Sequence, residues 1–234
     1  MSILSNIINI YIAPGKVFEA VKEYNWKNAF IPFVIIAVLG LISYWAIEDL
    51  ANDYGYQKAV STIENMDRLT DEQKIDQIAK IEERIDGPQI TSWISSALGG
   101  PITVFFMTLI ALLVGNTFMG GTAKYGQLLN ITAWAYMVNI LENIVKIPLM
   151  LNKWTLEVYT GLGVLGIGEQ GSFINSLLAG MDIFAIWRII LMAIGMGIIY
   201  NKKTKPYLIA LLIFWVILIA IGAGIQSFFI GITG

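Results

Sequence analysis

The stretch NAFIPFVIIAVLGLISYWAI, residues 28–47, contains no aspartate, glutamate, lysine or arginine in twenty positions. An α-helix rises about 1.5 Å per residue, so a helix of this length crosses the roughly 30 Å hydrocarbon layer of a membrane. Backbone polar groups inside that layer must be satisfied within the segment itself. We therefore expect residues 28–47 to form a transmembrane helix.

Four more apolar stretches follow, at residues 98–119, 125–151, 177–200 and 206–231. Hydrophobic residues make up 56% of the 234 positions and charged residues only 14%, whereas about a quarter of the residues of a soluble domain are charged. The sequence therefore predicts an all-α, polytopic helical membrane protein with about five transmembrane helices, its membrane domain covering residues 28–234.

The segment 48–92, between the first two predicted spans, is the strongly polar part of the chain. Eleven of the seventeen acidic residues lie between Glu48 and Asp86. Thr70 followed by Gln73 is a capping box, which predicts that a helix begins there. Residues 53–66 are expected to form the other arm of a helical hairpin outside the membrane. No loop has the ligand spacing of a calcium site, so a solvated helix face is favoured over an ion site.

Residues 1–27 have the pattern of an amphipathic segment that lies at the membrane surface. Apolar side chains recur at helical spacing while charged ones face elsewhere, and Trp26 stands next to the first span. An ordinary extramembrane helix is the alternative. Lysines lie within this segment, before the first span, and others follow the fourth span. We expect these residues to contact the interface: Lys16, Lys22, Trp26, Lys202, Lys203 and Lys205.

The placement of these lysines predicts the orientation of the chain. Five spans put both lysine clusters on one side, and the positive-inside rule makes that side cytoplasmic. The N-terminus is then cytoplasmic, and the acidic excursion and the C-terminus lie outside. The expected location is the cell (cytoplasmic) membrane, with the lipid bilayer as the first partner.

Several kinds of chemistry are disfavoured by composition. The chain has no histidine and no cysteine, which removes the commonest general base, the commonest metal ligand and thiolate chemistry. We expect no cofactor, no metal site and no enzymatic activity. A net charge of −2 predicts no nucleic-acid partner. The glycines from Gly161 to Gly166 match a dinucleotide fingerprint only formally, because that motif requires a strand and a helix around it.

The third predicted span contains the most informative polar pattern. Asn139, Glu142, Asn143 and Lys146 follow one another at i, i+3, i+4 and i+7, which places them on one helix face. Glu142 and Lys146, one turn apart, can neutralise each other. In the fourth span, Asp182 and Arg188 do not share a face, so we expect Arg188 to find its partner, Glu142, on another helix.

Two interpretations of this intramembrane polar network compete. In one, the stripe lines a path for an ion, a proton or a small solute, because charges inside a membrane are costly and commonly functional. In the other, the charges pair and fix how the helices pack, with the asparagines as interhelical hydrogen-bonding groups. Acidic and basic residues nearly balance here, which favours the structural interpretation.

Several short motifs occur in a familiar order along nearly the whole chain. They are Pro14-Gly15-Lys16-Val17-Phe18 before Trp26, then Gly120-Gly121 through Tyr125-Gly126 leading to Ala133–Tyr136, and then Asp182-Ile183-Phe184-Ala185-Ile186-Trp187 with Leu191 and Gly195 beyond. In this order the chain resembles the Yip (Ypt/Rab-interacting protein) family, specifically its compact prokaryotic-type branch. Members often carry proline where this chain has Met137-Val138.

The resemblance implies five spans, a cytoplasmic N-terminus and an external C-terminus. For eukaryotic relatives it implies binding of Rab-type GTPases and roles in vesicle trafficking and membrane shaping. We therefore expect a non-enzymatic membrane protein that acts through a membrane or cytosolic protein partner or on membrane organisation, with homo-oligomerisation left open. The alternatives are a transporter or channel along the polar stripe and, less favoured, a lipid-handling enzyme.

Overall fold

The computed structural model describes residues 3–23, 25–87, 89–169 and 171–233, with side chains described throughout these ranges except at Asp86 and residues 229–233. Across these residues the regular structure is helical, apart from one isolated β-bridge between Gly161 and Asp182. Long apolar helices dominate, which confirms the prediction of an all-α, polytopic membrane protein.

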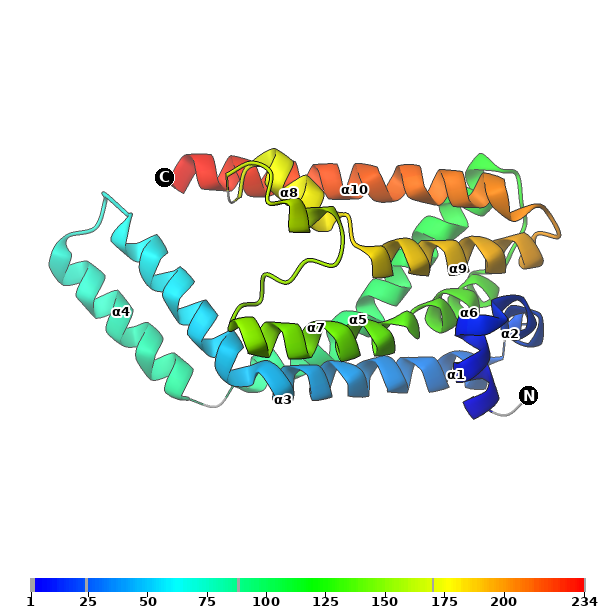
Figure 1. Cartoon of the computed structure of the whole chain (residues 1–234), viewed down its shortest axis with the longest axis horizontal. Helices are drawn as coiled ribbons and strands as arrows, with labels where there is room; N and C mark the ends of the chain where they lie inside the picture. Colours follow the sequence, from blue (N-terminus) through cyan, green and yellow to red (C-terminus); the bar gives the residue numbers. More distant parts are fainter. Residues whose placement is uncertain (1–2, 24, 88, 170, 234) are drawn as a thin grey trace.

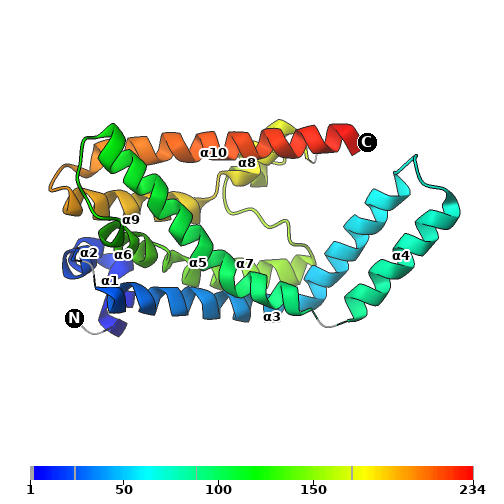
Figure 2. The same ribbon diagram turned by 180° about the vertical axis from the view of Figure 1, so that it is seen from behind.

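The helices form an elongated bundle with two different ends (Figure 1). One end carries α1 (Ile3–Ile12), α2 (Pro14–Val21), the α5–α6 connection and the α9–α10 loop. The opposite end carries an arm made by the last part of α3 (Trp26–Glu64) and α4 (Asp71–Asp86). Figure 2 shows the same arrangement from behind, with α5 crossing the bundle obliquely.

Helix α3 is longer than the bilayer that it is expected to cross. Its 39 residues span about 58 Å at the standard helical rise. The backbone is non-helical at Ile47, with φ −119° and ψ 15°, and the helix kinks there. The predicted end of the first span coincides with this kink, and the chain continues as helix into the arm.

The arm is the helical hairpin that the polar segment predicts. The Thr70 hydroxyl accepts from the Gln73 backbone N–H, and the Gln73 side chain accepts from the Thr70 N–H, so both bonds of the predicted capping box are present. Tyr56 donates to Glu82 Oε1 at 2.7 Å across the hairpin. Side chains of the arm are mostly exposed, so few apolar contacts hold its two helices together.

Helix α5 (Ile90–Leu112) begins earlier than the sequence suggests. The second predicted span begins at residue 98, whereas Pro101 lies well inside the helix. Trp93, in its first turn, donates to Glu48 Oε1 at 3.2 Å, which holds the early turns of α5 against α3. The helix ends in a π-helical segment, η1 (Leu113–Phe118).

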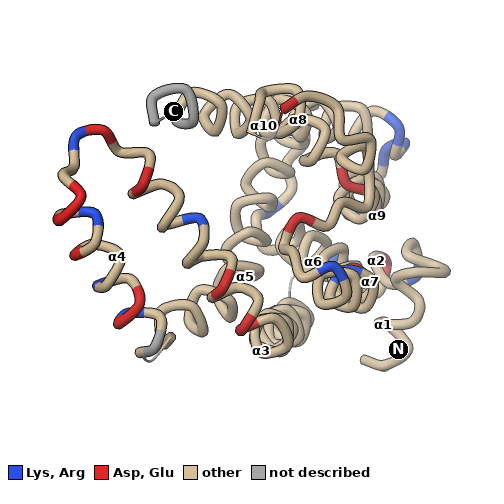
Figure 3. Tube along the Cα trace, turned by 60° about the vertical axis from the view of Figure 1, so that its left-hand side comes forward, with Lys and Arg blue, Asp and Glu red and all other residues tan. Residues whose placement is uncertain are grey.

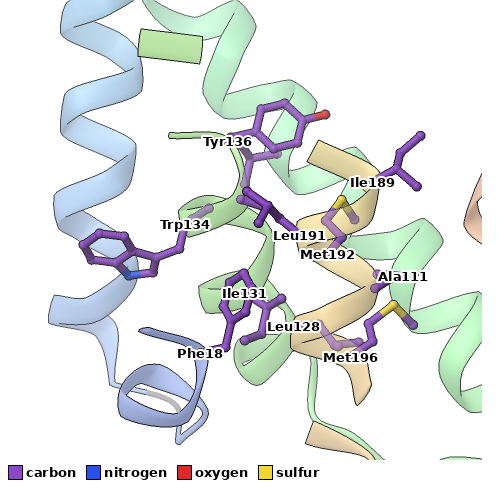
Figure 4. Close-up of a cluster of buried hydrophobic side chains, with 14 of the residues drawn as sticks. Phe18, Ala111, Leu128, Ile131, Trp134, Tyr136, Ile189, Leu191, Met192 and Met196 are labelled. Carbon is purple, nitrogen blue, oxygen red and sulfur yellow. The ribbon is translucent and has the colours of Figure 1, made fainter. Parts of the chain in front are cut away.

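The third predicted span is two helices, α6 (Tyr125–Ala135) and α7 (Val138–Lys153), separated by a turn at Tyr136 and Met137. Every residue from Leu128 to Val138 is buried, so α6 lies at the centre of the fold. Figure 4 shows Leu128 and Ile131 of this helix among apolar side chains of α2 and α9, whereas Trp134 points toward α3 and donates to the Asn28 carbonyl. At the break, the Met137 carbonyl accepts from the Ile140 backbone N–H at 3.1 Å and from the Tyr11 hydroxyl at 2.5 Å.

The N-terminal segment divides into two helices with different surroundings. In α2, Val17 and Phe18 are fully buried against the bundle. The side chain of Asn130 donates to the carbonyls of Val21 and Glu23, which ties the end of α2 to α6. Helix α1 instead exposes one apolar face, where half or more of each side chain is accessible: Ile3, Leu4, Ile8 and Ile12.

The fourth predicted span, 177–200, is not one continuous helix. Helix α8 (Phe173–Gly180) ends before Asp182, and α9 (Ile183–Ile199) begins after it. The 17 residues of α9 measure about 26 Å, close to the thickness of a hydrocarbon layer. Helix α10 (Thr204–Thr233) then runs back along α9 and α8. The number of crossings stays a prediction. Among the described residues, four candidate spans meet a length of 18 residues, with α6 and α7 taken together as one of them, and α9 is one residue shorter.

Candidate functional site

The candidate site is a network of charged side chains between α7 and α9. Asn139, Glu142 and Lys146 lie on one face of α7, and Arg188 lies on the facing side of α9. Asp182 stands at the point where α9 begins. The structure therefore brings together five of the six residues that the sequence singled out for this network.

The charges alternate along the network. Lys146 Nζ lies 2.6 Å from Glu142 Oε1 and 2.9 Å from Asp182 Oδ2. Arg188 Nη1 pairs with Glu142 Oε2, as the sequence predicts, and also donates to Asn139 Oδ1 at 2.8 Å. Along the order Arg188–Glu142–Lys146–Asp182 positive and negative side chains alternate, so the net charge of the four is zero. These four side chains are only 14–18% exposed, so mutual pairing offsets the cost of holding each one away from water.

Asp182 is also the N-cap residue of α9, which explains the break before this helix. Its Oδ1 atom accepts from the backbone N–H groups of Phe184 and Ala185, at 2.8 and 3.3 Å, and so caps the helix. Its Oδ2 atom accepts from the Thr160 hydroxyl at 2.5 Å in addition to pairing with Lys146. A carboxylate at a helix N-terminus also complements the helix dipole. One residue thus joins α7, α9 and the connection between α7 and α8.

That connection approaches Asp182 very closely. The Leu162 backbone N–H donates to the Met181 carbonyl at 3.0 Å, beside the bridge between Gly161 and Asp182. A Cβ atom on Gly161 would lie 1.8 Å from the Met181 carbonyl oxygen. Glycine is therefore required here by close backbone approach, and the glycine-rich connection is anchored at this point.

Aromatic rings cover the two cations. Lys146 Nζ lies 6.0 Å from the centre of the Phe184 ring, and the Arg188 guanidinium lies 5.3 Å from the centre of the Tyr136 ring. The ring faces are electron-rich and attract cations. Thr132 lies one helical turn before Tyr136 in the sequence. Thr132 is buried and its hydroxyl has no hydrogen-bond partner among the described atoms, so it does not join the network.

Asn143 is the predicted site residue that the structure leaves outside this network. With Asn139 it lines a cavity of about 340 Å³ between α3, α5 and α7. Tyr44 also lines this cavity, and its buried hydroxyl has no hydrogen-bond partner among the described atoms. The Ile47 kink of α3 borders the same space. Asn139 therefore belongs both to the charge network and to the wall of this cavity.

The predicted interfacial residues gather at the end of the bundle that carries α1 and α2. Lys16, Lys202, Lys203 and Lys205 are exposed there, and Trp26 begins α3 with 59% of its surface accessible. Figure 3 shows that many of the acidic residues lie along the opposite arm. The two ends of the molecule therefore differ in charge.

One lysine of this group is paired. Lys22 Nζ lies 2.9 Å from Glu19 Oε2 on the surface of α2. The hydrogen bond to Glu19 raises the pKa of Lys22 above its ordinary value, so Lys22 carries its charge throughout the physiological pH range.

One residue that contacts the charge network, Thr160, could not be found from helix spacing. Thr160 precedes Asp182 by 22 residues and lies in an irregular segment, so no periodicity relates the two. The capping role of Asp182 did have a signal, because aspartate directly before an apolar helical run is a typical N-cap. We placed Asp182 inside the span rather than at the start of a helix, and so missed the break.

An all-α chain with long apolar helices and a charge-neutral network between two of its helices is an integral membrane protein of the polytopic helical class. A comparison with family models matches residues 8–225 to the Yip1 domain. The chain belongs to this family, which confirms the family resemblance seen in the sequence, while its place in a prokaryotic-type branch stays a prediction. Comparisons with curated proteins and with solved structures give no match.

Proposed function

We propose that this Yip1-domain protein is a non-enzymatic membrane protein whose charge network is structural. We further propose that it acts on the membrane or on partners through the end of the bundle that carries α1, α2 and the α9–α10 loop, which we call the basic end. The observation that carries the proposal is the pairing within the network. Among the described residues, each charged side chain of the network has an oppositely charged partner within it. A group that binds or carries an ion must exchange partners, and here both carboxylates would first have to release a cation.

The basic end combines exposed positive charge with an exposed apolar helix face. Its lysines are exposed, and the uncharged helix α1 presents its apolar face beside them. Exposed apolar residues next to basic ones are typical of segments that lie at a membrane surface. We infer that α1 rests in the bilayer interface and that the lysines face the cytoplasmic leaflet or a cytosolic partner. Which protein partner binds, and whether the chain self-associates, are not defined by these contacts.

A transporter or channel is the second candidate, and one observation favours it. The cavity lined by Asn139, Asn143 and Tyr44 lies beside the network, and the Tyr44 hydroxyl in its wall has no hydrogen-bond partner within the described part of the chain. A solute path would pass through this cavity and along Glu142. The two candidate functions therefore make different predictions for substitutions at Asn143 and Glu142.

A flux measurement in liposomes separates them. We expect wild-type protein to produce no flux of protons, sodium, potassium or small polar solutes above that of protein-free vesicles. Asn143→Leu, which fills the cavity without touching an ion pair, is expected to leave both flux and thermal stability nearly unchanged. Flux in the wild type that disappears in a stably folded Asn143→Leu protein would establish the transporter and reject the structural interpretation of the network.

A further inference from the structure

A second cavity lies at the basic end of the bundle, between α2 and the turn that joins α9 to α10. Its volume is about 500 Å³, within the range of sites that bind small molecules. The residues that line it come from α2, from the end of α9 and from the α9–α10 turn. Figure 1 shows this turn at the end of the bundle, where the chain turns back. The residues that line it are Glu19, Ile194, Gly197, Ile198, Asn201, Lys202, Lys203 and Thr204.

The turn that carries the two lysines has a defined geometry. Lys202 N donates to the Gly197 carbonyl at 2.9 Å, and Asn201 N donates to the Ile198 carbonyl at 3.2 Å. Asn201 has a left-handed φ of 50°. This is the Schellman pattern of a helix C-terminus, with asparagine in the place where glycine or asparagine is preferred. Lys202 therefore projects from a backbone that is fixed by hydrogen bonds, and Lys203 is the next residue along the chain.

The cations of this cavity are available to a ligand. Among the described side chains, no ion pair joins Lys202 or Lys203 to a carboxylate. Lys202 Nζ makes only a long contact, 3.4 Å, with the Met119 carbonyl. The single acidic residue in the wall, Glu19, is already paired with Lys22. The cavity therefore offers positive charge that is not neutralised within the protein.

The cavity is also amphipathic. Ile194 and Ile198 of α9 form an apolar wall, and the lysines and Asn201 form the polar side. The surrounding end of the molecule is strongly basic, because seven lysines accompany two glutamates in its segments: Lys16, Lys22, Lys27, Lys124, Lys202, Lys203 and Lys205 with Glu19 and Glu23. Basic pockets between helices at the cytoplasmic side of a membrane are suited to anionic lipid headgroups.

We propose that this cavity binds the phosphate-bearing headgroup of an anionic phospholipid, with Lys202 and Lys203 on the phosphate and Ile194 and Ile198 against the first carbons of the acyl chains. A free phosphate ion would use the lysines alone and would leave the apolar wall without a contact. The proposal rests on the proposed function, since it specifies how the basic end acts on the membrane.

The test is a lipid titration of purified protein in detergent, with short-chain phosphatidylglycerol as the probe and short-chain phosphatidylcholine as the neutral reference. Binding is followed by native mass spectrometry and by the rise in thermal stability. Two variants with equal loss of charge are compared, Lys202→Gln/Lys203→Gln in the cavity and Lys16→Gln/Lys205→Gln at the same end but outside its wall. Glycerol 3-phosphate competes in a parallel titration.

We expect phosphatidylglycerol to bind the wild type more tightly than phosphatidylcholine, and the cavity variant to lose about tenfold or more of that affinity. The control variant is expected to stay within about twofold of the wild type, because it removes the same charge away from the cavity. Equal losses in both variants would overturn the proposal in favour of diffuse attraction. Displacement by glycerol 3-phosphate at the lipid's own concentration would overturn the assignment to a lipid. Neither outcome affects the flux result, so failure of this site is distinguishable from failure of the proposed function.

Discussion

Glu142→Gln is expected to lower the free energy of unfolding by about 2–4 kcal/mol, because it leaves Arg188 partly buried without a carboxylate. Glutamine preserves the shape of the side chain and removes only the charge. Lys146 keeps Asp182 at 2.9 Å, so the loss is concentrated at Arg188. The measurement is denaturation by sodium dodecyl sulfate in mixed micelles, followed by tryptophan fluorescence.

Two further variants make this prediction specific. Glu142→Gln/Arg188→Gln restores neutrality and should be less destabilised than the sum of its single variants, with a coupling of about 1–3 kcal/mol. Asp76→Asn breaks the 2.6 Å pair with Lys80 on α4, where both side chains are more than 60% exposed. Its expected cost is below about 0.5 kcal/mol. Equal costs for Glu142→Gln and Asp76→Asn would show that the buried network does not stabilise the bundle.

Gly40→Ala is expected to destabilise the bundle by about 3 kcal/mol, because a methyl group at this position has no space. Gly40 of α3 faces the backbone of α5, and its Cβ would lie 2.0 Å from the Ser96 carbonyl oxygen. A backbone atom cannot rotate away as the end of a side chain can, so the two helices must separate. Close approach at small residues is a common way for membrane helices to associate.

Gly99→Ala is the matched control for this substitution. Gly99 lies on α5, close in sequence to Ser96, yet an added Cβ would meet no atom within 4 Å. Alanine is the better helix former, so Gly99→Ala is expected to be neutral or to stabilise by up to about 1 kcal/mol. Thermal unfolding of both variants beside the wild type checks the pair. Similar midpoints for the two variants would contradict the close packing of α3 on α5.

Local sequence patterns predicted much of this fold. The run of residues 28–47 ends at the α3 kink, and the Thr70–Gln73 box caps α4 as expected. The partner of Arg188 was also predictable, because an arginine in an apolar helix needs a carboxylate and Glu142 was the candidate on another predicted span. Each of these features depends on residues near one another in sequence, or on the high cost of an unpaired charge.

The remaining features depend on contacts between distant segments. The break between α8 and α9 lies inside a run of apolar residues, and it is held by Thr160 and the Gly161 bridge as well as by the Asp182 cap. The division of the N-terminal segment depends on burial of Val17 and Phe18 against the bundle, which their periodicity does not distinguish from contact with lipid. Periodicity identifies an apolar face but not what covers it.

The proposed function and the proposed lipid site share one claim, that the chain crosses the membrane five times with both lysine clusters on the cytoplasmic side. The α9–α10 turn lies at the same end of the bundle as α1 and α2, which supports this claim (Figure 1). If α9 did not cross, four crossings would place Lys203 on the opposite side from Lys16. The side on which Lys203 lies therefore distinguishes the two topologies.

The most direct measurement is labelling of single cysteines by a membrane-impermeant maleimide in intact cells. The chain has no cysteine of its own, so each introduced one reports alone. We predict that Gln77→Cys, on α4, is labelled in intact cells, whereas Lys16→Cys and Lys203→Cys are labelled only after the membrane is permeabilised. Labelling of Lys203→Cys together with Gln77→Cys in intact cells would contradict five crossings and, with them, the cytoplasmic basic surface.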